Sequence, residues 1–144
     1  MTAVRERIFA EIETRLRLIA NPLVAEVARM PSGDPTRLPA VFIFDQGDMI
    51  AEDEEETDTM AFVMAVGIDG FVAGDAAHTD ANALYSGVVE ALFPQPVLCG
   101  LATQIRIVRL DMAVAERAKD HRLGFGLELH IHYHTRFGEP QQPA

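Results

Sequence analysis

The stretch that decides the fold is 123-LGFGLELHIHYHTRF-137, close to the C-terminus. Its side chains alternate in character, which is the period of an extended strand with one face against a core. One face carries a mostly apolar set: Leu127, Leu129, Ile131, Tyr133, Thr135 and Phe137. The other face carries Glu128, His130, His132, His134 and Arg136. The sequence therefore predicts a long strand with one buried face and three histidines on the other.

The rest of the chain divides into two helical and several extended segments. Apolar residues at helical spacing predict a helix over residues 4–19 and another over residues 76–93. Apolar runs and alternation predict strands over residues 23–30, 38–45, 59–74 and 103–112. Residues 46–58 are expected to form a mobile, solvated loop, residues 113–122 a connector, and residues 139–144 a flexible tail. With 144 residues, the whole chain suits a single domain.

Two of the expected strands are apolar on both faces. The runs 40-AVFIF-44 and 61-AFVMAVGI-68 have no alternation, and such strands need cover on both sides. Two helices on one face would leave the second face open. We therefore expect another subunit to cover it, with Val41 and Val63 as candidate interface residues.

Charge is distributed unevenly along the chain. The formal net charge is −10, and no Lys or Arg lies between Arg37 and Arg106 although twelve acids do. This argues against phosphate-backbone binding as the main task. It suits a basic partner surface, with Asp53, Glu54, Glu55 and Glu56 as contact residues, head-to-tail stacking of like subunits, or simple solubility. The acidic run does not match the ligand spacing of an EF-hand calcium loop.

The three histidines allow two interpretations. A His-x-His pair on one strand can share a metal ion with a third ligand, for which His78, His121 or Glu128 are candidates. Three ligands in a straight row suit one tetrahedral ion poorly, so His130, His132 and His134 are weak metal candidates. A solvated or interfacial polar face is the simpler interpretation.

Nothing in the sequence predicts an active site or a cofactor. It contains no GxSxG, P-loop, dinucleotide fingerprint, CxxC or HExxH motif. The lone Cys99 is expected to be a small core or interface residue rather than a nucleophile. The N-terminus is interrupted by charges and no apolar run is long enough to cross a membrane as a helix, so we expect a cytoplasmic setting.

Four features in this order resemble the tail terminator proteins of long-tailed bacteriophages. They are the N-terminal amphipathic segment VRERIFAEIETRLRLI; LPAVFIFDQGD running into the acidic segment and a long strand; the helix ANALYSGVVEALF after GDAA; and the ending HYHTRFGEP, with Tyr133, Thr135, Gly138 and Pro140. The resemblance covers almost the whole chain.

The resemblance implies an α+β fold, a single domain with a mixed, mostly antiparallel sheet of about five strands and two main helices on one face. It implies a ring of identical subunits, usually a hexamer, that caps the tail tube, stops its polymerisation and meets the head–tail connector protein. Assembly would take place in the bacterial cytoplasm and end in the tail or neck of the virion. A histidine-based metal protein and a small α+β ligand-binding module remain the alternatives.

Overall fold

The structure, a computed structural model, describes residues 2–51, 58–94, 97–117 and 120–144. Its elements follow in the order α1 (Val4–Arg17), β1 (Glu26–Arg29), β2 (Ala40–Ala51), β3 (Thr59–Ala73), α2 (Ala77–Leu92), a short 3-10 turn η1 (Val97–Gly100), β4 (Gln104–Arg117), β5 (Asp120–Arg136) and β6 (Glu139–Pro143). The fold is α+β in a single small domain, as expected. None of the described helices has the length and apolar character needed to cross a membrane.

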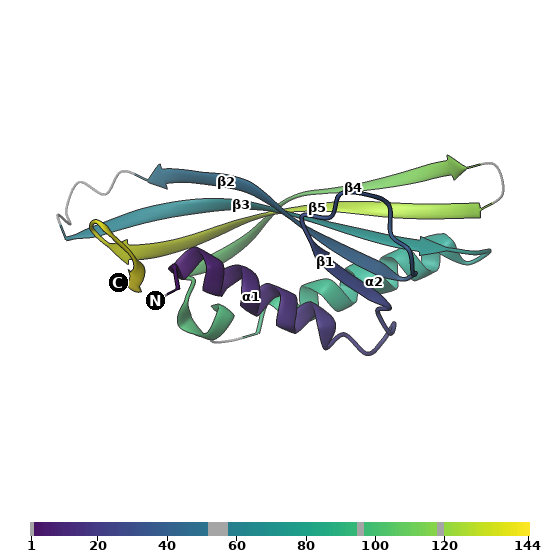
Figure 1. Cartoon of the computed structure of the whole chain (residues 1–144). Coiled ribbons are helices and arrows are strands. Elements are labelled where there is room, and N and C mark those ends of the chain that lie inside the picture. The colour runs from purple at the N-terminus through teal and green to yellow at the C-terminus, as the bar shows by residue number, and fades with distance from the viewer. Residues whose placement is uncertain (1, 52–57, 95–96, 118–119) are drawn as a thin grey trace.

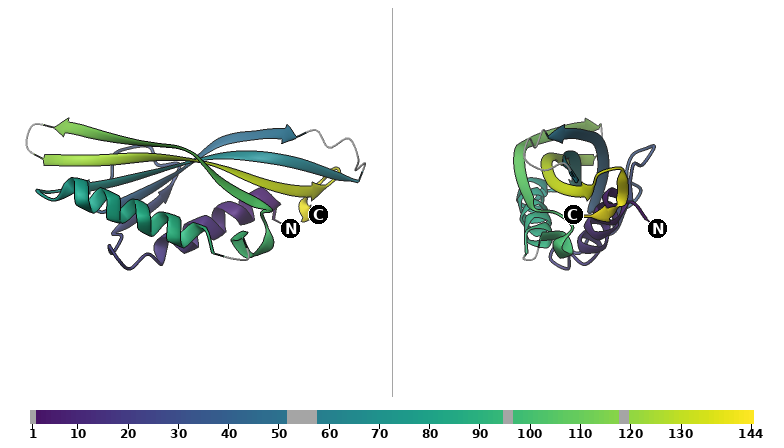
Figure 2. Two further views of the ribbon diagram at one scale, coloured as in Figure 1. Left: turned by 180° about the vertical axis from the view of Figure 1, so that it is seen from behind. Right: turned by 90° about the vertical axis from the view of Figure 1, so that its left-hand side faces the viewer.

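The six strands form one sheet in the order β1-β2-β3-β5-β4, with β6 paired to the end of β5. Only β1 runs parallel to its neighbour, and all other pairs are antiparallel. The sheet is a long twisted strip, and both helices lie on the same face of it (Figures 1 and 2). Thr59 pairs with Arg136, and Ala73 pairs with Arg122. The end of the strip where the chain passes from β2 to β3 is therefore opposite to the end where it passes from β4 to β5.

The core lies between this face and the two helices. Alternate residues of β5 from Phe125 to Tyr133 point into it, and each is at most 2% exposed. The helices supply the stripes that the sequence predicts: Val4, Ile8, Phe9, Ile12 and Leu16 from α1, and Ala81, Leu84, Val88 and Leu92 from α2. At about 25 cal/mol per Å² of apolar area, burial of this face is the main favourable term for the subunit.

Three sequence-based boundaries are wrong. Residues 46–51, expected in a loop, continue β2, and residues 52–57 lie outside the described part of the chain. The described part of the expected connector 113–122 extends β4 and begins β5. The expected tail contains β6, whose Glu139 and Pro143 pair with Arg136 and Thr135. The total of six strands agrees with the expected sheet of about five.

Strands β2 and β4 each contain a β-bulge. The pairing of β2 with β3 shifts register between Asp45 and Asp48, and that of β4 with β5 between Ile107 and Arg109. A bulge bends its strand and strengthens the local twist. At the first bulge Gly47 has a φ of 89°, a conformation that favours glycine.

Candidate functional site

The histidine row lies on the sheet face opposite the helices. His130, His132 and His134 are each partly exposed, and their Cα partners on β3 are Ala65, Val63 and Ala61. On the other side, β4 places Arg106 opposite His130 and Gln104 opposite His132. The three imidazoles thus stand in a line along β5. Apolar side chains of β3 lie on one side of the line, and the polar side chains of Gln104 and Arg106 lie on the other.

This arrangement does not bring three metal ligands together. Among the described residues, no group of three or more His, Cys, Asp or Glu side chains could hold a metal ion. Glu128 lies next to His130, with Oε1 3.7 Å from Nε2. His78 belongs to α2, which covers the opposite face of the sheet. The side chain of His121 is outside the part of the chain whose side chains the structure describes.

Protonation of His132, in the middle of the row, is disfavoured. Partial burial lowers its pKa, and the nearby charges of Arg106, His130 and His134 lower it further. A charged imidazolium loses hydration on burial and is repelled by a neighbouring guanidinium. His132 is therefore neutral near pH 7, and a drop in pH would place a poorly tolerated charge at the centre of this face.

A small hollow of about 210 Å³ lies further along the same face. Its lining includes Gln46, Asp69, Arg109, Asp111 and Glu128. Burial raises the pKa of Asp69, while Arg109 Nε lies 2.6 Å from Asp111 Oδ2. The hollow is polar, and its arginine is engaged by a carboxylate of the same strand.

A cluster that the sequence analysis missed ties α1 to the bulge of β2. The guanidinium of Arg5 donates to both oxygens of Asp45, at 2.9 and 3.0 Å, and to Asp48 Oδ1 at 2.9 Å. Tyr133 on β5 donates its hydroxyl proton to the other oxygen of Asp48. The hydrogen bonds from Arg5 hold the pKa of Asp45 below its usual range. The pKa of Tyr133 is raised, mainly by burial and also by its hydrogen bond to Asp48. The cluster joins three elements and fixes where the outer half of β2 leaves the core.

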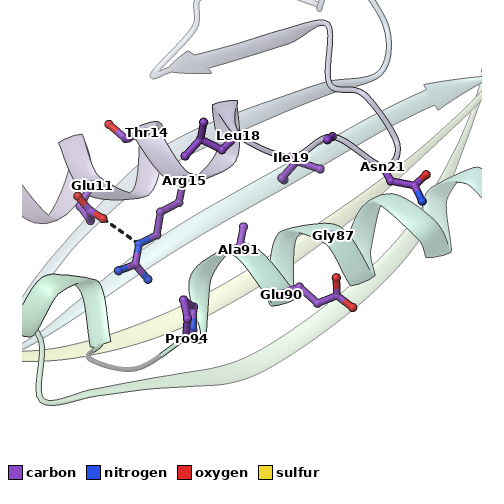
Figure 3. A pocket seen from close by; sticks show the side chains of 11 residues that line it. Glu11, Thr14, Arg15, Leu18, Ile19, Asn21, Gly87, Glu90, Ala91 and Pro94 are labelled. Atoms are coloured by element: carbon purple, nitrogen blue, oxygen red, sulfur yellow. Dashed lines mark hydrogen bonds and ion pairs between the residues drawn. The ribbon is translucent and has the colours of Figure 1, made fainter.

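A larger cavity of about 560 Å³ lies between α1 and α2, and Figure 3 shows its lining. Arg15 reaches down from α1 between the helices and donates from Nε to Glu11 Oε1 at 2.8 Å. The thiol of Cys99 also donates to this oxygen, at 3.3 Å. Cys99 is exposed on η1, so of the two expected settings, core or interface, it is not in the core of the subunit. Glu90 adds a second carboxylate to the lining, so the cavity does not favour an anion.

The sequence-based interface residues have different outcomes. Val41 is fully buried in the core beneath the helices, so its assignment to a partner interface is wrong. Val63 is partly exposed on the histidine face and remains a candidate. Asp53, Glu54, Glu55 and Glu56 lie outside the described residues. The outer face near Val41 is covered within the chain, because Phe42 is 3% exposed with its ring 5.3 Å from that of Phe71.

Exposed large apolar side chains gather on the two long edges of the sheet. Ten such side chains are found in the described part of the chain, and six of them lie on the outer half of β2 or on β4: Met49, Ile50, Ile107, Val108, Leu110 and Met112. Met49 and Ile50 are 72% and 65% exposed. Exposed apolar side chains that lie close together are typical of contact surfaces, whereas singly scattered ones are not.

Comparison with known proteins supports the fold. No family model and no curated protein matches the chain. Among solved structures, it is similar to a chain of the structure titled "Virion of native gene transfer agent (GTA) particle", with a TM-score of 0.53 and 16% sequence identity over 90% of each chain. At this level of identity the similarity shows a shared fold over nearly the whole length of both chains.

Proposed function

We propose that this chain is a virion structural protein, and specifically a tail terminator that forms a closed ring on the end of a tail tube. The ring would stop tube polymerisation and present a surface to the head–tail connector protein. The observation that carries the proposal is the fold shared with a virion chain over 90% of both lengths. The order of sequence features that resembles phage tail terminators supports it independently.

The surface of the subunit suits assembly. Its exposed apolar side chains are concentrated on two strand edges, and the charges of its central third are all negative. A ring of identical subunits requires two different patches that fit each other, and opposite edges of one sheet provide two such patches. The tube and connector proteins would then meet the rims of the ring.

The proposal includes no chemical reaction. In the most prominent polar cluster, Arg5, Asp45, Asp48 and Tyr133 are hydrogen-bonded to one another and join α1 to the sheet. The thiol of Cys99 donates to the carboxylate of Glu11, a weak base whose pKa is lowered by the hydrogen bond from Arg15. These contacts have a structural role, which agrees with a protein that assembles rather than catalyses. Assembly would occur in the bacterial cytoplasm and leave the protein in the tail or neck of the particle.

The direct test is tube growth in the presence of this chain. Purified tube protein from the same genome is allowed to polymerise with and without stoichiometric amounts of the chain, and tube lengths are measured by electron microscopy. We expect short tubes with a ring at one end. Unchanged tube lengths, with no ring attached, would exclude the terminator role.

The histidine-based alternative is tested separately by zinc titration in a calorimeter. We expect no stoichiometric submicromolar binding, because the three imidazoles lie in a row. Tight binding that is lost in His132→Ala would favour the metal alternative instead.

A further inference from the structure

Two edges of the sheet are open for pairing. Within the described residues, β4 pairs only with β5, so its other edge is free along Gln104–Arg117. On the opposite side, β1 pairs only with residues 40–43 of β2. Near the bulge, the N–H groups of Asp45 and Gly47 donate to Met30 Sδ and to Asp45 Oδ1. Beyond it, residues 48–51 have no strand on that side among the residues that the structure describes. An open edge presents unpaired backbone N–H and C=O groups, which are a template for another strand.

We infer that β4 of one subunit pairs with residues 48–51 of β2 in a second copy of the chain. The inference deepens the proposed function and rests on it for closure into a ring. It assigns the subunit contact to the two sheet edges, whereas the sequence suggested the faces around Val41 and Val63.

Strand direction favours this pairing. The strands β2, β3, β5 and β4 alternate in direction, so β2 and β4 run opposite ways within one subunit. A neighbour related by rotation about an axis along the strands keeps the directions of its own strands. Its β4 would therefore meet β2 in antiparallel orientation, which is slightly more stable per residue than parallel pairing. Repetition of the step joins the sheets of successive subunits through antiparallel contacts between β2 and β4, and the joined sheets can close into a ring.

The side chains at the two edges match in apolar character. Ile107, Leu110 and Met112 point to the helix side of β4 but are 38–40% exposed, because neither helix covers this strand. Ile50 points to the same side of β2, where its Cα partner Phe62 packs against the core, and Ile50 is 65% exposed. Edge pairing with the helices on one common side would place these apolar groups next to each other.

Symmetry selects which edges meet. Contact between two β2 edges, or between two β4 edges, is isologous, so it joins two copies and leaves their other edges open. Contact between β2 and β4 is heterologous, so it can repeat from copy to copy and close a ring. Charge does not oppose it, because Asp45 and Asp48 on the β2 side are bound to Arg5 of their own chain. The occupant of the β2 edge is therefore the β4 edge of another copy, in a head-to-tail contact.

The experiment uses two variants, each with one defective edge. Ile50→Lys places a charge on the β2 edge, and Leu110→Lys places one on the β4 edge. Leu23→Lys is the matched control, since Leu23 is 74% exposed but lies between α1 and β1, away from both edges. Circular dichroism checks that all three variants fold, and sedimentation measures assembly over a series of concentrations.

We expect the wild type and Leu23→Lys to assemble alike, and each edge variant alone to be monomeric, with self-association weakened at least roughly 30-fold, the loss of one interface hot spot. An equimolar mixture of the two edge variants should form a 1:1 heterodimer and nothing larger, because each retains the edge that the other lacks. Assembly of either edge variant like the wild type, failure of the mixture to form the heterodimer, or a wild type that stays monomeric throughout would overturn the inference.

Failure of the inference is distinguishable from failure of the proposed function. If the edge variants still form rings that cap tubes, the pairing is wrong and the terminator role stands. If the mixture behaves as expected but wild-type rings leave tube growth unchanged, the pairing is right and the terminator role is wrong.

Discussion

The aromatic ring of Phe125 lies against the Cα of Gly70, its partner on the neighbouring strand β3. A Cβ at position 70 would overlap three atoms of this ring. On its other side the ring meets Tyr85 of α2 edge-on, with centroids 6.1 Å apart. Gly70 is therefore required by packing, since it leaves the space that lets Phe125 fit between the sheet and α2.

Substitution Gly70→Ala should destabilise the subunit by about 1–3 kcal/mol, the usual cost of overpacking a core. Chemical denaturation measures the loss. Gly33→Ala is the control, because a Cβ at Gly33 meets nothing within 4 Å, and it should leave stability nearly unchanged. Partial recovery in Gly70→Ala/Phe125→Leu would identify the ring as the cause; equal stability of Gly70→Ala and the wild type would contradict the packing argument.

The Tyr133 hydroxyl should contribute measurably to stability. Tyr133 is 2% exposed and its proton is donated to a carboxylate, so Tyr133→Phe should cost about 1.5–3 kcal/mol. Because Arg5 binds the same carboxylate, the effects of Tyr133→Phe and Arg5→Ala should not add. A double-mutant cycle by urea denaturation tests this, and strictly additive losses would mean that the two contacts act independently.

The Arg5–Asp45 pair should make the subunit sensitive to acid. Its hydrogen bonds lower the pKa of Asp45 in the folded chain, so the unfolded chain binds a proton more readily. The stabilisation is complete above the unfolded pKa of about 3.9 and is lost as the pH falls through the folded pKa. Denaturation between pH 6 and pH 2.5 should show a shallower acid loss for Arg5→Met than for the wild type. Parallel curves would count against the pair.

His132 should destabilise the subunit at mildly acidic pH. Burial and neighbouring positive charge lower the folded pKa of His132, so the unfolded state again binds more protons. Stability should fall as the pH drops below about 6.5, the unfolded value, and the fall should be smaller in His132→Gln. An NMR titration gives the midpoint directly, and a midpoint at or above 6.5 for His132 would refute this prediction.

Charged substitutions at two valines should have opposite effects on folding. Val41→Asp buries a carboxylate in the core without a partner and should cost more than about 3 kcal/mol or prevent folding. Val63→Asp lies on the partly exposed histidine face and should leave the circular dichroism spectrum unchanged. Two folded variants of equal stability would mean that the sheet faces are assigned the wrong way round.

The sequence predicts elements well where one face is buried and poorly where pairing alone defines them. The alternation of residues 123–137 identifies β5 and its inner face correctly, because burial imposes a period of two. The run around Val41 is apolar on both faces, so its pattern could not reveal that Val41 faces the helices. Neither β6, which contains two prolines, nor the described outer part of the β4–β5 hairpin has a clear alternating pattern.

The polar clusters could not be predicted, because they join residues far apart in the chain. Arg5 lies 40 residues from Asp45, and Asp48 lies 85 residues from Tyr133. No local spacing indicates such contacts, which depend on how α1 is placed over the bulge of β2. The histidine row, in contrast, lies on a single strand, and its position follows directly from the sequence.

The bulges in β2 and β4 have a consequence for the period before any partner is present. An exposed, regular edge invites indiscriminate stacking into amyloid-like fibrils. Each open edge here is broken by a shift in register, between Asp45 and Asp48 on one side and between Ile107 and Arg109 on the other. A foreign strand, or a wrong alignment of the same strand, would meet a kink instead of a straight template. A newly made subunit can thus leave two edges available for pairing with other copies and still resist aggregation before assembly.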